Sequence, residues 1–201
     1  MNEPPSIEGL SPGFADPVGA AQTTFRAVLT ALSEPGRIMT LDLALEPPRP
    51  LGLASGALAL SLLDGDTPLW CDPAARTAIP SLRFHTGAPV VEAPERALFA
   101  LVADVAALPS LATFDAGSDE YPDHSATVLL AVEALGAGET LTLRGPGIPE
   151  TRALAVTGLP AGFRAEWRAN HARFPRGIDV ILTCGNRLAG LPRSVQIVEE
   201  R

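Results

Sequence analysis

Short apolar segments, most of them ended by glycine or proline, fill this chain and limit the folds that it can adopt. Its 201 residues include 20 prolines and 18 glycines, so turns cut the chain often. The 46% of apolar and 19% of charged residues are typical of a globular protein. The length suits one domain. We expect a loose N-terminal lead-in over residues 1–13 and a single α/β domain over residues 14–201.

Four segments have the pattern of helices. The first begins at Asp16-Pro17, because aspartate fits the N-cap position and proline fits the first helical position. It ends at Glu34-Pro35-Gly36. Apolar residues at helical spacing predict its buried face: Val18, Ala21, Phe25, Val28 and Leu32. The other helices are expected over residues 51–63, 77–84 and 163–174.

Strand-like segments alternate with these helices. They are bounded by turn residues and cover residues 37–43, 69–70, 97–102, 127–133, 140–144, 153–157, 179–183, 187–191 and 195–198. Cys184-Gly185-Asn186 predicts a tight hairpin between two of them. Because helices alternate with strands but hairpins also occur, we expect an α/β fold, a three-layer sandwich with a mixed β-sheet covered by helices.

The basic residues of the chain are all arginine, fifteen in number, and no lysine occurs. This excludes a pyridoxal phosphate Schiff base and a P-loop, since arginine cannot replace lysine in either. We therefore expect no such cofactor. The 23 acidic residues give a net charge of −8, and no basic run occurs. A nucleic-acid partner is therefore not expected.

Three features indicate a soluble, cytoplasmic protein. Cys71 and Cys184 lie far apart and form no C-x-x-C motif, which favours a reducing compartment. The N-terminus lacks the basic and apolar regions of a signal peptide. The longest nearly apolar stretch, residues 50–63, is too short to span a bilayer. No membrane association is expected.

No recognisable catalytic motif occurs. His85, His124 and His171 share no metal-ligand spacing. The residues of Asp123-His124-Ser125 are adjacent and cannot reach one another in triad geometry. An acidic loop could hold a divalent cation, although a solvated surface loop is the better interpretation; its carboxylates are Asp115, Asp119, Glu120 and Asp123. We predict neither a catalytic residue nor a metal site.

One segment could bind an anion. Gly145-Pro146-Gly147-Ile148 follows a predicted strand and Arg144, and glycines can expose backbone N–H groups that form an anion nest. Arg152 follows nearby. The candidate anion site therefore consists of Arg144, Gly145, Gly147 and Arg152. A plain turn at a strand end is the favoured alternative.

A series of motifs resembles the PhnH family of carbon–phosphorus lyase subunits. It includes the segments at residues 14–36, 82–89, 97–102, 117–128 and 143–148. The closing pattern is the clearest, with Phe174-Pro175-Arg176-Gly177-Ile178-Asp179 followed by Leu188 to Ser194. The resemblance covers about residues 14–198. Each motif alone is weak, but their order and spacing together are specific.

The resemblance implies a role in bacterial phosphonate degradation. Members of the family act with partner subunits to transfer the ribose triphosphate moiety of ATP to an alkylphosphonate. The fold implied is similar to the large domain of pyridoxal-phosphate-dependent transferases, but without the cofactor. The implied partners are other carbon–phosphorus lyase core subunits, with a homodimer in isolation. No catalytic residue is implied, and we expect an auxiliary subunit.

Two alternatives remain. A stand-alone enzyme for a phosphorylated small molecule would gain support if several arginines converged beside Gly147, namely Arg144, Arg152, Arg176 and Arg193. A small-molecule-binding regulatory module instead predicts a closed apolar pocket. If the protein is a subunit, we expect its contact surface near the hairpin at residues 179–191, because a terminal strand offers an open edge.

Overall fold

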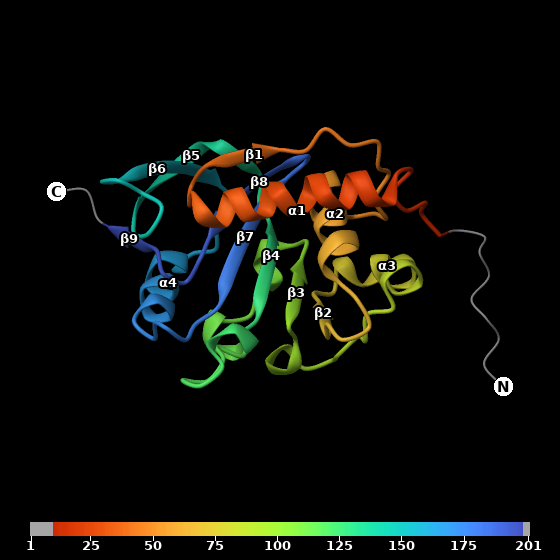
Figure 1. Cartoon of the computed structure of the whole chain (residues 1–201). Coiled ribbons are helices and arrows are strands. Elements are labelled where there is room, and N and C mark those ends of the chain that lie inside the picture. Colours follow the sequence, from red (N-terminus) through yellow and green to blue (C-terminus); the bar gives the residue numbers. More distant parts are fainter. Residues whose placement is uncertain (1–9, 199–201) are drawn as a thin grey trace.

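A computed structural model describes residues 10–198, so most of the predicted lead-in lies outside the described residues (Figure 1). The helices are α1 (Pro17–Ser33), α2 (Leu53–Leu62), α3 (Ile79–Thr86) and α4 (Phe163–His171). The strands are β1 (Ile38–Thr40), β2 (Leu69–Cys71), β3 (Phe99–Val102), β4 (Thr127–Ala131), β5 (Ala134–Arg144), β6 (Arg152–Thr157), β7 (Asp179–Cys184), β8 (Arg187–Leu191) and β9 (Gln196–Val198).

The strands form two sheets. The larger has six strands in the order β1-β8-β7-β4-β3-β2, in which β2, β3, β4 and β7 are parallel, β8 is antiparallel to β7, and β1 is antiparallel to β8. The smaller sheet has the order β6-β5-β9 and is antiparallel. The mixed α/β fold is confirmed. The prediction expected helices on both faces of one sheet. Instead, one of the two outer layers contains the small sheet together with α4.

Alternating side chains of the large sheet pack into two separate cores. On β4, Leu129 belongs to a core shared with α1, α2 and α3. Its neighbours Val128 and Leu130 belong to a second core, shared with β5, β6 and α4. The molecule therefore has a helical layer, a central sheet, and a layer that combines the small sheet with α4.

Helix α1 begins where the sequence predicts. Asp16 is the N-cap, and its Oδ1 accepts a hydrogen bond of 3.1 Å from the Gly19 amide. The predicted buried face is right at Val28, which is 4% exposed, and wrong at Val18 and Phe25, which are 68% and 48% exposed. The buried residues are mostly small: Thr24, Ala27, Val28 and Ala31. Small residues let α1 lie directly on the sheet, and its larger apolar side chains therefore face outward.

Two further predictions need correction. Strand β5 begins at Ala134, because its register shifts between Leu135 and Glu139 and so accommodates glycines that normally end a strand. The hairpin of β7 and β8 is confirmed, but β8 lies between β7 and β1 and offers no open edge. The open edge that was the reason to expect a contact surface near this hairpin is therefore absent at β8.

Candidate functional site

The candidate anion segment follows β5 and packs against the C-terminal end of α1. The guanidinium Nη1 of Arg152 donates hydrogen bonds to the carbonyls of Glu34 and Pro35, at 3.0 and 3.1 Å. Gly147 has a φ of +79°, and a Cβ there would collide with the carbonyl oxygen of Ser33. Arg152 therefore stabilises the end of the helix, where carbonyl groups carry partial negative charge, and Gly147 lets the segment approach it closely.

Arg144 and Gly145 have a different environment. They line an open surface hollow of about 520 Å³ together with Ile148, Pro149, Glu150 and Thr151. The Arg144 side chain is the cation of this hollow, and the Glu150 carboxylate opposes it in charge. Two of the four predicted anion-site residues thus line one hollow, while Gly147 and Arg152 contact α1.

The arginines that would support a stand-alone enzyme are paired at separate places. The Nε of Arg176 lies 3.1 Å from Oδ1 of Asp119. Arg193 donates to both carboxylate oxygens of Asp179, at 3.1 and 2.5 Å, and to the carbonyl of Pro122. Arg152 contacts the same end of α1 as Gly147, whereas Arg176 and Arg193 pair at the acidic loop, so the arginines do not converge beside Gly147.

Three of the recognised motifs meet at the amino-terminal edge of β4 and β7. The acidic loop at residues 115–123 precedes β4, and the Phe174–Asp179 motif leads into β7. The Gly177 amide donates to the carbonyl of Ala116 at 2.9 Å. Arg193, from the last motif, joins Asp179 to the acidic loop. Sequence order gave no sign of this cluster, because it depends on the parallel pairing of β4 with β7.

Within this cluster, the histidine and serine do not form a catalytic pair. The ring of His124 stacks on Tyr121 with centroids 5.0 Å apart. The Ser125 hydroxyl is buried, and its oxygen has no hydrogen-bond partner within residues 10–198. Over the same residues, no group of three or more His, Cys, Asp or Glu side chains is placed to hold a metal ion.

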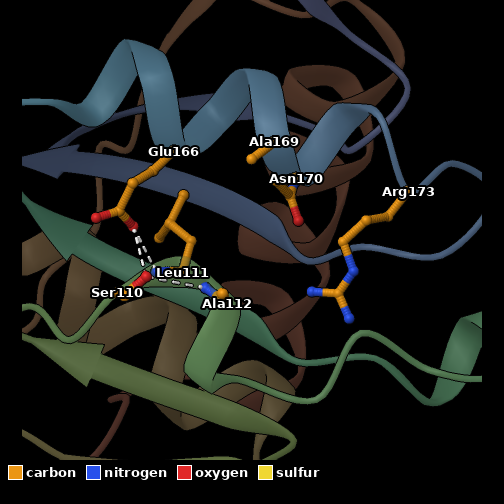
Figure 2. Close-up of a pocket in the computed structure, with 7 residues that line it drawn as sticks. All are labelled: Ser110, Leu111, Ala112, Glu166, Ala169, Asn170 and Arg173. Carbon is orange, nitrogen blue, oxygen red and sulfur yellow. Dashed lines mark hydrogen bonds between the residues drawn. The ribbon is translucent and has the colours of Figure 1, made fainter.

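A small pocket lies between α4 and the segment at residues 110–112 (Figure 2). The Glu166 carboxylate accepts hydrogen bonds from the Leu111 amide at 2.6 Å and the Ser110 hydroxyl at 3.2 Å. Arg173 enters the pocket at the other end (Figure 2). The volume of about 70 Å³ is well below the roughly 300–1,000 Å³ of typical ligand pockets. A nucleotide does not fit.

The carboxyl end of β2 carries a buried cysteine and a buried aspartate. Desolvation raises the pKa of the Cys71 thiol from its ordinary 9.0 to about 12, and the Asp72 carboxylate acts in the same direction. The Asp72 side chain accepts hydrogen bonds from the amides of Ala75, Ala103 and Asp104, at 2.7, 3.2 and 2.8 Å. Cys71 is therefore a neutral core residue, and Asp72 fixes the loops after β2 and β3.

No helix within residues 10–198 has the length and apolarity needed to cross a bilayer. The described residues thus form a mixed α/β protein in which Arg152, Arg176 and Arg193 join loops and a helix end. Residues 12–198 match the model of the family described as bacterial phosphonate metabolism protein (PhnH). The chain belongs to this family, as its motif series predicted.

Two relatives are similar along most of their length. The α-D-ribose 1-methylphosphonate 5-triphosphate synthase subunit PhnH of Rhizobium meliloti (strain 1021) is 45% identical over 192 residues, which cover 94% of this chain and 96% of the relative. HtxG of Stutzerimonas stutzeri, assigned provisionally as a C-P lyase subunit, is 36% identical over 180 residues, or 88% and 85% of the two chains. Both names describe subunits of a larger assembly.

Proposed function

We propose that this protein is a subunit of a bacterial carbon–phosphorus lyase system. With its partner subunits, it transfers the ribose triphosphate moiety of ATP to an alkylphosphonate. The product is an α-D-ribose 1-alkylphosphonate 5-triphosphate, and adenine leaves. One observation carries this proposal: the 45% identity to the synthase subunit of Rhizobium meliloti, over 94% of the chain.

The arrangement of charged side chains supports an auxiliary role within that assembly. A catalytic site gathers titratable groups in one cleft. Here Arg176, Arg193 and Arg152 hold Asp119, Asp179 and the end of α1, and the pocket beside α4 is too small for ATP. We infer that other core subunits supply the reacting groups.

Reconstitution with purified partner subunits tests the function. The mixture should convert ATP and methylphosphonate into the ribosyl triphosphate product, as followed by phosphorus NMR and adenine release. Omission of this chain should abolish or sharply reduce turnover. The chain alone should give no turnover. Turnover by the chain alone would instead favour the hypothesis of a stand-alone enzyme.

We also propose that the fold is related to the large domain of pyridoxal-phosphate-dependent transferases and has no use for the cofactor. The sequence contains no lysine, so no ε-amine can form the internal aldimine. Incubation with pyridoxal phosphate, gel filtration and a visible spectrum test this. A stoichiometric aldimine band on the protein contradicts it.

For the candidate anion site, the proposal rests on the hollow beside Arg144. Its guanidinium is the group best placed there to pair with phosphate oxygens, while Gly147 and Arg152 have their contacts at α1. Titration with inorganic triphosphate should show weaker binding for Arg144→Ala than for Arg83→Ala, an exposed position on α3. Equal binding by the two variants would contradict an anion site at Arg144.

We propose, finally, that the chain is a cytoplasmic homodimer when separated from its partners. The absence of a C-x-x-C motif and the wide separation of Cys71 and Cys184 support a reducing compartment. A two-fold pair is the commonest symmetric assembly of soluble proteins. The surface that could form such a pair is argued next.

A further inference from the structure

The outer face of α1 is apolar and has nothing packed on it within the described part of the chain. Six large apolar side chains of residues 10–198 are exposed, and three of them lie on this helix. Val18 is 68% exposed, Phe25 48% and Leu29 51%. Helix α1 crosses the outside of the helical layer (Figure 1). We name the surface of Val18, Phe25 and Leu29 the α1 stripe.

The spacing of the α1 stripe places its members in one line. At 3.6 residues per turn, positions 18, 25 and 29 point within about 40° of one another, and they extend over about 17 Å of the helix. Gln22 completes the line. This narrow seam is the pattern of a helix that packs along a second helix, whereas isolated exposed apolar residues are scattered around a surface.

The charge of α1 favours a second copy of this chain as the partner. A two-fold contact brings a surface against itself, so in a protein of net charge −8 most surfaces repel their own copy. Residues Pro17–Ser33 contain no acidic side chain and a single basic one, Arg26. By contrast, exposed Tyr121 lies in the acidic loop at residues 115–123.

The shape of the stripe also suits a two-fold pair. In an antiparallel arrangement centred between Gln22 and Phe25, Val18 of one copy faces Leu29 of the other. Phe25 then enters the hole formed by Val18, Ala21, Gln22 and Phe25 of the second helix, the spacing of a knobs-into-holes contact. Antiparallel helix dipoles oppose each other favourably.

We propose that the α1 stripe is the contact surface of a homodimer, in which two copies of α1 pack antiparallel. This inference rests on the homodimer proposed above and identifies the contact surface of that dimer. It differs from the expectation based on the hairpin of β7 and β8, whose edge is covered by β1.

Light scattering with size-exclusion chromatography tests the surface directly. The wild-type chain should have the mass of two copies, and Phe25→Glu and Leu29→Arg should each raise the dimer dissociation constant by more than about tenfold, as expected for a central apolar contact. Phe84→Glu is the matched control, because Phe84 is 52% exposed on α3. It should remain dimeric. Circular dichroism and thermal unfolding confirm that each variant folds.

A cross-link gives a second readout that does not depend on weakened association. Under mild oxidation, Gln22→Cys should yield a disulfide-linked dimer in a Cys184→Ser background, whereas the Cys184→Ser chain alone, with Cys71 buried, should not. A monomeric wild-type chain overturns the inference, and so does a Phe25→Glu variant that stays dimeric. If Phe25→Glu stays dimeric but no longer joins the partner subunits, the stripe belongs to another subunit. Turnover in the reconstituted mixture is measured separately, so failure there counts against the proposed function alone.

Discussion

The two faces of the six-stranded sheet are packed by different means. The face under α1, α2 and α3 is rich in fully buried alanine: Ala31, Ala54, Ala57, Ala59, Ala75, Ala78 and Ala88. The face under the small sheet and α4 contains the buried aromatic residues: Trp70, Phe114, Phe163 and Trp167. The helical layer therefore depends on close approach of backbones, and the opposite layer depends on large side chains that fill space.

The outer helices of the two layers differ in the same way. On α4, Glu166 binds residues 110–111, and Arg164 pairs with Glu139 on β5 at 2.5 Å. Charged side chains of α4 thus bind other segments of the same chain. On α1 the outward residues Phe25 and Leu29 are apolar and about half exposed. The outward side of α1 therefore keeps exposed apolar side chains, on which the homodimer surface proposed above is based.

The largest effect should come from removing the central aromatic residue of the second layer. Trp167 is fully buried, and its indole N–H donates to the carbonyl of Val195 at 2.9 Å. Trp167→Ala should lower the free energy of unfolding by about 3–5 kcal/mol, because it leaves a cavity and an unpaired carbonyl. Urea denaturation measures this, with Phe84→Ala as the exposed control. A loss below about 1 kcal/mol would contradict the space-filling role of the aromatic residues.

Enlarging a small residue should instead damage the helical layer. At Gly190 on β8, a Cβ would lie 2.5 Å from the carbonyl oxygen of Ala31 on α1. Gly190→Ala should cost about 1–3 kcal/mol, because the helix must move away from the sheet. Gly65→Ala is the matched control, with no atom within 4 Å of the added Cβ. If thermal unfolding gives the same stability for both variants, the helical layer does not depend on close approach of α1 to β8.

A smaller effect is expected at the Glu166 carboxylate. Glu166→Ala removes the hydrogen bonds to Leu111 and Ser110, and the free energy of unfolding should fall by about 1–2 kcal/mol. Arg83→Ala, on the exposed side of α3, should change it by less than about 0.5 kcal/mol. If both substitutions have the same small effect in urea titrations, the hydrogen bonds of the Glu166 carboxylate do not stabilise the fold.

The smallest effect is an alkaline loss of stability in the helical core. Because burial raises the pKa of Cys71 to about 12 from 9.0, the folded chain keeps this proton when the unfolded chain releases it. Stability should therefore be constant below pH 9 and fall as the pH rises above 9, by at most about 1.4 kcal/mol per pH unit. Urea midpoints at pH 8, 9 and 10 measure this fall in stability. In Cys71→Ala, the part of the fall above pH 9 that is due to this thiol should be absent. The absence of lysine keeps this window clear of amine titrations.

Local signals predicted most of the elements. Asp16-Pro17 marks the start of α1, and the hairpin between β7 and β8 turns at Gly185. Predicted boundaries failed where tertiary contacts override local preference. Strand β1 contains three residues, because only these pair with β8. The predicted helix over residues 163–174 ends at His171.

The anion segment shows the limit of such reasoning at a site. Glycines after a strand favour both an anion nest and a close turn, so the local pattern cannot choose between them. The carbonyls of Glu34 and Pro35, which bind Arg152, come from a segment more than a hundred positions away. No spacing rule within residues 144–152 could have indicated them.

The sequence by itself determined its own lack of a lysine amine, its mixed α/β class and, through the order of its motifs, its family. These follow from residue identity and local spacing, which folding does not change. Only the tertiary structure decided which side of α1 is buried, where the arginines find their partners and which strand edges are covered. Those outcomes depend on contacts between distant segments. The periodicity of α1 placed Phe25 inward, but close packing of Ala31 against Gly190 turned the helix so that Phe25 faces outward.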